Sequence, residues 1–352
     1  MRFVALVVIA WNRSRRGVSP SRVANLHCLD PYEVNLGTRT GRRHHRRRLF
    51  LTILLLGTGA GTARAQGLIA TFASADTAEH QRRFGDATRL YERAYGESGF
   101  DPVCMALAAG AAARAGLSDI AFRDLNRAID EGFLDAQYFA RDTDTFVLHR
   151  DPRWTGLESK LRERRAAVDS SLRQELLTLA MQDQQSRNGV GAVLARFGHA
   201  SPQGDSVDRA IAAADAPRLD RLKAIIAARG WPGRKLVADD GAHAAWLLVQ
   251  HAPFDYQREV VPLLLSALQR NDVRAGDVAL LRDRVLISEG KAQIYGTQAR
   301  SSDKPGPPVL DAIADEPCVD ARRKSVGLEP LAVYLKSLGI TYDGPPGVCK
   351  AT

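Results

Sequence analysis

Small and apolar residues recur at helical spacing along most of the chain after residue 65, and this pattern constrains the fold more than any other feature. The same part is rich in Ala, Leu and Arg, has little of the alternation typical of strands, and carries Gly where helices are expected to end. It holds about 287 residues, enough for two domains with cores of their own. We expect a mainly α fold, with a helical region over 66–160 and a C-terminal helical domain over 161–352 that has at most a short extended segment.

Two helical hairpins are expected over residues 71–130, broken at Gly85 and Gly116. They resemble each other at a constant offset, at which Ala87, for example, matches Ala121. This offset equals the period of tetratricopeptide repeats, and small residues at matching positions let paired helices approach closely. The resemblance implies an interaction scaffold that binds a protein or peptide partner. Generic amphipathic helices that agree by accident are the alternative, because only two copies are visible.

The formal charge of +9 comes from the segment 1–65. This segment holds twelve of the 49 Lys and Arg residues and two of the 40 Asp and Glu residues, which leaves 37 basic and 38 acidic residues in the rest. A neutral remainder without a stripe of basic and aromatic residues is not expected to bind nucleic acid.

Residues 1–41 contain an apolar run of their own, which we ascribe to a misassigned start of the chain, with a true N-terminal extension as the alternative.

The segments before Gln66 follow the order of a signal peptide. A basic run over 42–48 precedes an apolar run over 49–57 that is too short to cross a bilayer, and Ala63-Arg64-Ala65 forms a small-x-small cleavage site. We expect cleavage after Ala65 and export, periplasmic or secreted, by the Sec route or by the twin-arginine route. A short buried helix after a basic loop is the alternative interpretation.

Three cysteines follow the expected cleavage site. Cys318 and Cys349 could form a disulfide in an oxidising compartment and hold the C-terminal tail, although spacing alone does not test the geometry. Cys104 lies in an Ala-rich helical pattern and is expected to be a small buried apolar residue.

The C-terminal region is divided by helix start and stop signals. Periodicity predicts a long charged helix over 156–200, a loop over 200–208, and a helix that begins at Pro217 and ends at Gly230. Asp239 or Asp240 is expected to cap the next helix. The remaining expected elements are helices over 241–251, 259–269, 277–289 and 320–338, the last interrupted near Gly327, an extended segment over 291–298 and a loop over 300–315.

A set of short motifs occurs between residues 170 and 340. They are Asp183-Gln184 with Arg187, Gly230-Trp231-Pro232-Gly233, Asp240-Gly241, Ala245-Trp246-Leu247-Leu248-Val249-Gln250-His251, Asp283-Arg284, Tyr295-Gly296-Thr297-Gln298, and Arg322-Arg323 with Gly327-Leu328. Together they resemble a bacterial family known as domain of unknown function 6624. The resemblance identifies the domain and implies no particular activity. Arg282 stands where we expect Thr in a Thr-Asp-Arg pattern, so that hydroxyl has no role here.

The first functional hypothesis is a binding module of the cell envelope. The hairpins would recruit a protein or peptide partner through a concave surface, and the C-terminal domain would recognise a peptide or a small polar ligand. Side chains with flat surfaces or hydrogen-bonding ends are the candidate ligand contacts. They are Trp231, Trp246, Gln250, Arg284, Tyr295 and Gln298.

The second hypothesis is an enzyme of the hydrolase type. His251 or His243 would act as the base, Asp283 would orient it, and Gln250 or Gln298 would donate to developing negative charge. Against this hypothesis, the chain has no Gly-x-Ser-x-Gly elbow and no His-Glu-x-x-His helix.

The third hypothesis is purely structural, with the same polar residues satisfying buried backbone groups.

We expect no cofactor. We also expect no metal site, because His243 and His251 are eight positions apart, whereas two metal ligands on one helix face are four positions apart. No apolar run in the chain after Ala65 approaches the length that a membrane span needs.

Overall fold

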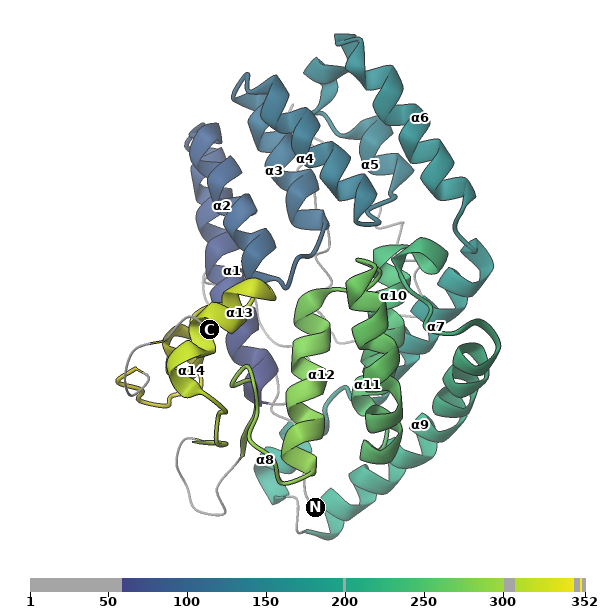
Figure 1. Ribbon diagram of the computed structural model, residues 1–352, viewed down its shortest axis with the longest axis vertical. Helices are drawn as coiled ribbons and strands as arrows, with labels where there is room; N and C mark the ends of the chain where they lie inside the picture. Colours follow the sequence, from purple (N-terminus) through teal and green to yellow (C-terminus); the bar gives the residue numbers. More distant parts are fainter. Residues whose placement is uncertain (1–58, 199–200, 301–307, 345–348, 350–352) are drawn as a thin grey trace, which may run out of the picture. The chain divides into compact units, whose positions relative to one another are not determined.

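The computed structural model describes residues 59–198, 201–300, 308–344 and 349, which form a mainly α fold (Figure 1). The predicted basic and apolar parts of the signal peptide lie outside these residues. The predicted cleavage site after Ala65 falls within the first helix, α1 (Gly59–His80). Within the described residues, no helix is both long enough and apolar enough to cross a bilayer.

Four consecutive helices form the expected hairpins. After α1 come α2 (Phe84–Glu97), α3 (Val103–Arg114) and α4 (Ser118–Asp130), and each packs on the helix before it. The starts of α2 and α4, at Phe84 and Ser118, keep the offset found in the sequence. Gly116 adopts a positive φ of 76° between α3 and α4, as a helix-ending glycine should. The break expected at Gly85 is wrong, because the chain turns earlier, at Arg82 with φ 60°.

The core of the hairpins consists largely of alanine. Ala87, Ala108 and Ala121 have no exposed surface, so the helix backbones approach closely, as the sequence pattern indicates. The segment that follows contains α5 (Ala136–Arg141), the 3₁₀-helix η1 (Phe146–Arg150) and α6 (Arg153–Ala166).

The long helix expected over 156–200 is wrong, because three helices occupy this stretch. α6 is followed by α7 (Ser170–Ser186) and α8 (Val190–Phe197). Asp169 caps α7 by accepting a hydrogen bond from Leu172 N at 2.9 Å. Gly189 takes a left-handed φ of 80° before α8. A cap and a left-handed glycine therefore divide a pattern whose periodicity looks continuous.

The expected loop over 200–208 is also wrong from Pro202 onward, where α9 (Pro202–Arg229) begins. Ser201 Oγ accepts from Gly204 N at 3.0 Å, and Pro202 occupies the first turn, where its missing N–H costs nothing. Pro217 lies inside this helix rather than at its start. The expected end at Gly230 is confirmed, with φ 71°.

The next three helices build the centre of the C-terminal domain: α10 (Arg234–His251), α11 (Phe254–Gln269) and α12 (Ala275–Ser288). α10 packs against α7, α9, α11 and α12, and Trp246 on it is fully buried. The helix begins earlier than expected and is kinked at Ala238, which has φ 59° and ψ 179°. This backbone region is populated almost only by glycine, so Ala238 is strained.

The C-terminal segment is mostly extended, with short helices. Gln293, in the segment expected to be extended, forms a parallel bridge with Ile313, and β1 (Ala299–Arg300) pairs antiparallel with β2 (Val309–Leu310), so the stretch 300–315 expected to be a loop contains strand residues. The expected final helix, interrupted near Gly327, is formed by two short helices, α13 (Val319–Ser325) and α14 (Leu331–Ser337), and the 3₁₀-helix η2 (Glu316–Cys318) precedes them.

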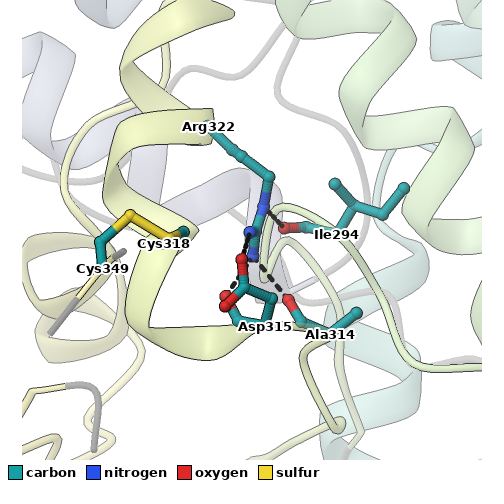
Figure 2. Close-up of a disulfide and its surroundings, with 6 residues drawn as sticks. All are labelled: Ile294, Ala314, Asp315, Cys318, Arg322 and Cys349. Carbon is teal, nitrogen blue, oxygen red and sulfur yellow. Dashed lines mark hydrogen bonds and ion pairs between the residues drawn. A yellow bond between two sulfur atoms is a disulfide. The ribbon is translucent and has the colours of Figure 1, made fainter. Parts of the chain in front are cut away.

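A disulfide joins Cys318 to Cys349, and Cys104 is a buried free thiol. Figure 2 shows Arg322 of α13 near this disulfide. Its guanidinium donates to Ile294 O at 2.9 Å and to Ala314 O at 2.6 Å. Arg322 therefore holds α13 against the extended segments, and the disulfide joins η2, which directly precedes α13, to Cys349.

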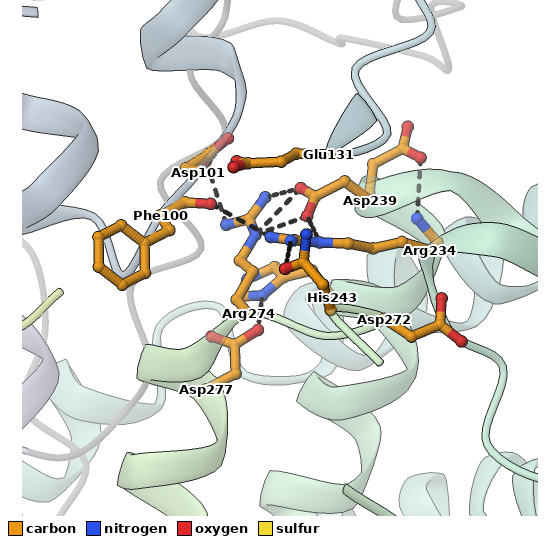
Figure 3. A network of polar contacts seen from close by, with 12 residues as sticks. Phe100, Asp101, Glu131, Arg234, Asp239, His243, Asp272, Arg274 and Asp277 are labelled. Carbon is orange, nitrogen blue, oxygen red and sulfur yellow. Dashed lines mark hydrogen bonds and ion pairs between the residues drawn. The ribbon is translucent and has the colours of Figure 1, made fainter. Parts of the chain in front are cut away.

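A buried ion network connects α10 and α12 to the loop after α2 (Figure 3). Arg234 Nε lies 2.7 Å from Asp239 Oδ1, and Arg274 pairs with Asp239 and, at 3.1 Å, with Asp101. Burial would raise the pKa of Asp239, but Arg274 and Arg234 outweigh it and lower that pKa. Each guanidinium in this network faces a carboxylate, which marks the network as part of the fold.

Candidate functional site

Five helices, α7 and α9 to α12, surround a cavity of about 480 Å³. Apolar side chains such as Ile211, Leu219 and Leu248 form part of its wall. The charged residues that line it come from α7, α9 and α12. They are Asp183, Arg187, Asp208, Asp215, Arg218 and Arg284, accompanied by Gln250, His251 and Gln257.

His251 forms a histidine–carboxylate pair at this cavity. Its Nδ1 lies 2.8 Å from Oδ2 of Asp183, whose residue surface is only 1% exposed. A carboxylate at Nδ1 favours the tautomer with the proton on Nδ1, which leaves Nε2 as an acceptor. Burial is the largest cause that lowers the pKa of His251, and it outweighs the opposing effect of Asp183. The ring is therefore neutral near pH 7 and can accept a proton.

The carboxylate of Asp183 is held by a second chain of charges. Arg187 Nη1 donates to Asp183 Oδ1 at 2.7 Å, and Arg187 Nη2 lies 2.6 Å from Asp215 Oδ2. Arg218 Nη2 binds the other oxygen of Asp215, also at 2.6 Å. These two arginines thus form ion pairs with the two aspartates and their charges cancel, although Nε of Arg218 is buried without a hydrogen-bond partner among the described residues.

Arg284 differs from the other cavity arginines. Only 8% of its surface is exposed, and its Nη1 donates to the carbonyl oxygen of Gln250 at 2.8 Å. No carboxylate of the described residues lies within ion-pair distance of it, and its Nε is buried without a hydrogen-bond partner. Burial lowers the pKa of Arg284 to about 10. The cavity therefore contains one cation whose charge is not balanced by a neighbouring side chain.

Two amide oxygens near this cation also have no partner. Gln257 Nε2 donates to Gln250 O at 3.1 Å and to Ala252 O at 2.7 Å, which fixes the Gln257 amide. The Oε1 atoms of Gln250 and Gln257 are buried and accept no hydrogen bond from the described residues. Unsatisfied buried acceptors carry an energetic cost unless a ligand or water donates to them.

Of the candidates from sequence, Gln250, His251 and Arg284 line the cavity. His243 instead pairs with Asp277 at 2.7 Å and stacks on Trp246 away from the cavity lining. Trp231 and Trp246 are buried core residues. Tyr295 and Gln298 are not in the lining either.

The expectation that Asp283 orients a catalytic histidine is wrong. Both carboxylate oxygens of Asp283 accept backbone N–H bonds, from Ile294 at 2.7 Å, from Tyr295 at 3.0 and 3.1 Å and from Thr297 at 3.1 Å. The Thr297 hydroxyl adds a bond at 3.0 Å. Asp283 therefore fixes the extended segment, and Asp183 and Asp277 are the partners of the histidines.

Sequence reasoning missed the roles of Asp183, Arg187, Asp215 and Arg218. Asp183 lies on α7, and Arg187 follows four residues later as the C-cap of that helix, a spacing that places an acidic and a basic side chain on one helix face. No local signal connects them to His251, which is 68 residues away. No cluster of three or more His, Cys, Asp or Glu residues able to hold a metal ion occurs among the residues that the structure describes.

Searches of curated proteins and of solved structures found no match to this chain. Residues 170–344 match a family whose description is "Family of unknown function (DUF6624)", and no family match covers the hairpins before them. The match includes every charged residue of the cavity lining. Residues 170–344 of this chain therefore form a domain of the DUF6624 family of unknown function.

Proposed function

We propose that the C-terminal domain binds a small ligand through an anionic group in the cavity between α7 and α9 to α12. The observation that carries this proposal is Arg284, a buried guanidinium with no carboxylate partner among the described residues. A buried charge without a partner destabilises the fold, whereas a buried ion pair can often be replaced by apolar residues at no cost. A buried guanidinium without a carboxylate therefore indicates a partner from outside the chain, such as a ligand. A ligand carboxylate is the planar partner that a guanidinium fits best.

The cavity has the other properties of a small-molecule site. Its volume of about 480 Å³ lies in the range of about 300–1,000 Å³ that such sites occupy. Apolar wall residues provide burial, while a few polar groups at fixed positions provide orientation.

Titration calorimetry on the purified protein tests this proposal with N-acetyl-L-leucine and its neutral amide. The acid is expected to bind and the amide to bind at least about tenfold more weakly, because a hydrogen bond to a charged group contributes about 1.5–3 kcal/mol. Arg284→Met should remove the difference, and Arg282→Met on the same helix, outside the cavity lining, is the matched control. Equal binding of acid and amide would contradict the proposal.

Hydrolysis is a second candidate, favoured by the pair of His251 and Asp183. His251 Nε2 would take a proton from a water molecule that attacks a bound ester or amide, and Asp183 would stabilise the charged ring. Mono-p-nitrophenyl succinate offers a carboxylate and an activated ester in one probe. His251→Gln is expected to lower kcat at least about 100-fold, while Arg284→Met raises KM. Undiminished turnover in His251→Gln would rule out this role.

Export is proposed for the whole protein, with the hairpins as a partner-binding scaffold. The disulfide between Cys318 and Cys349 supports an oxidising compartment. N-terminal sequencing of the protein from its native host should begin at Gln66, and retention of the leader would contradict cleavage.

The candidate partner contacts of the hairpin region are Phe146 and Val147, whose residues are 52% and 62% exposed. A Phe146→Ser/Val147→Ser variant should lose any partner captured by cross-linking.

A further inference from the structure

One carboxylate at the cavity is unpaired, as one guanidinium is. Asp208 of α9 lines the cavity, is exposed, and forms no ion pair with any described residue. The other lining charges cancel, because Arg187 and Arg218 bind Asp183 and Asp215. What remains is a buried positive charge at Arg284 and an exposed negative charge at Asp208.

From this charge arrangement we infer that the ligand is a zwitterion, a short apolar peptide with free ends. Its C-terminal carboxylate binds Arg284 and its N-terminal ammonium binds Asp208. This inference rests on the proposed function, since it needs the anionic group at Arg284. It adds the second charge and therefore the class of the ligand.

The other groups that line the cavity fit a peptide rather than a simple amino acid. The free Oε1 atoms of Gln250 and Gln257 are acceptors, which suits the N–H of an amide next to a bound carboxylate. Ile211 and Leu219 of α9, together with Leu248, offer an apolar wall for side chains. A ligand with two charged ends, an internal N–H and apolar side chains satisfies all of these groups at once.

The two ends of the ligand are expected to contribute unequally. Arg284 is desolvated, so its bond to a carboxylate is strong, whereas Asp208 is exposed and its bond to an ammonium is screened by water and salt. The carboxylate should therefore dominate affinity, and the ammonium should add a smaller contribution that weakens at high salt.

Titration calorimetry with three matched probes tests the inference: Leu-Leu, N-acetyl-Leu-Leu and Leu-Leu amide. Leu-Leu should bind most tightly, the acetylated peptide about two- to fivefold more weakly, and the amide at least about tenfold more weakly. Asp208→Asn should remove the advantage of Leu-Leu over its acetylated form. Asp205→Asn, an exposed position three residues earlier on α9 and outside the cavity lining, should leave it unchanged.

The outcomes separate the inference from the proposed function. Equal binding of Leu-Leu and N-acetyl-Leu-Leu, unaltered by Asp208→Asn, would overturn the zwitterion and leave anion binding intact. Failure of both peptides to bind, together with no preference for N-acetyl-L-leucine over its amide, would overturn the proposed function itself. Tighter binding of free leucine than of Leu-Leu would overturn the peptide assignment.

Discussion

Two arginines at α12, Arg274 and Arg284, are both largely shielded from solvent and differ in what faces them. Arg274 meets Asp101 and Asp239, and these carboxylates outweigh burial and raise its pKa well above the ordinary value. Arg284 meets a carbonyl oxygen and a cavity, and burial lowers its pKa to about 10. Arg274 therefore stabilises the fold, whereas Arg284 is a candidate ligand contact.

Arg274→Met is the largest test of this contrast. It leaves Asp101 without its arginine and removes one of the two cations that face Asp239, so we expect the free energy of unfolding to fall by about 3–5 kcal/mol in urea denaturation. Arg282→Met should stay within about 0.5 kcal/mol of the original protein. If Arg274→Met were as stable as its control, the network in Figure 3 would not hold the fold.

Asp283→Asn sharpens the contrast between neighbours, since Asp283 is satisfied by the backbone while Arg284 is not. The substitution replaces one charged acceptor oxygen by an NH₂ that faces N–H donors. We expect a loss of about 2–3 kcal/mol, with ligand affinity retained in the folded fraction. A variant that kept its stability but no longer bound the ligand would show that Asp283 belongs to the ligand-binding site.

The pH dependence of stability reports the environment that His251 shares with Arg284. The folded pKa of His251 lies below the unfolded value of about 6.5, so the unfolded chain takes up the proton first as the pH falls. The free energy of unfolding should therefore fall as the pH drops below about 6.5. His251→Gln should flatten this part of the profile, whereas His80→Gln, at an exposed position, should not.

NMR titration of His251 gives a smaller and more local effect. Arg284 is one of the charges that lower the pKa of this histidine, after burial and Arg187. In Arg284→Met the His251 pKa should rise, because a like charge has been removed. An unchanged titration would mean that Arg284 does not influence the pair of His251 and Asp183.

The sequence predicted the class of fold and part of the site, for identifiable physical reasons. Helical periodicity and glycine signals located most helices, but periodicity cannot show a break made by a cap such as Asp169, and Pro217 was assigned a start because proline favours first turns. Gln250, His251 and Arg284 were named because of their residue types. Asp208 was not named, and Asp183 was named only as part of a family motif, because the contacts that place them at the cavity join helices far apart in the chain.

The most direct test of the central claim is the unfolding free energy of Arg284→Met without ligand, measured beside the original protein. We predict no loss and a gain of up to about 1 kcal/mol, because methionine fills a similar volume without a buried unpaired charge. A loss of more than about 2 kcal/mol would show that Arg284, like Arg274, is a structural residue, and would contradict the assignment of the cavity as an anion site.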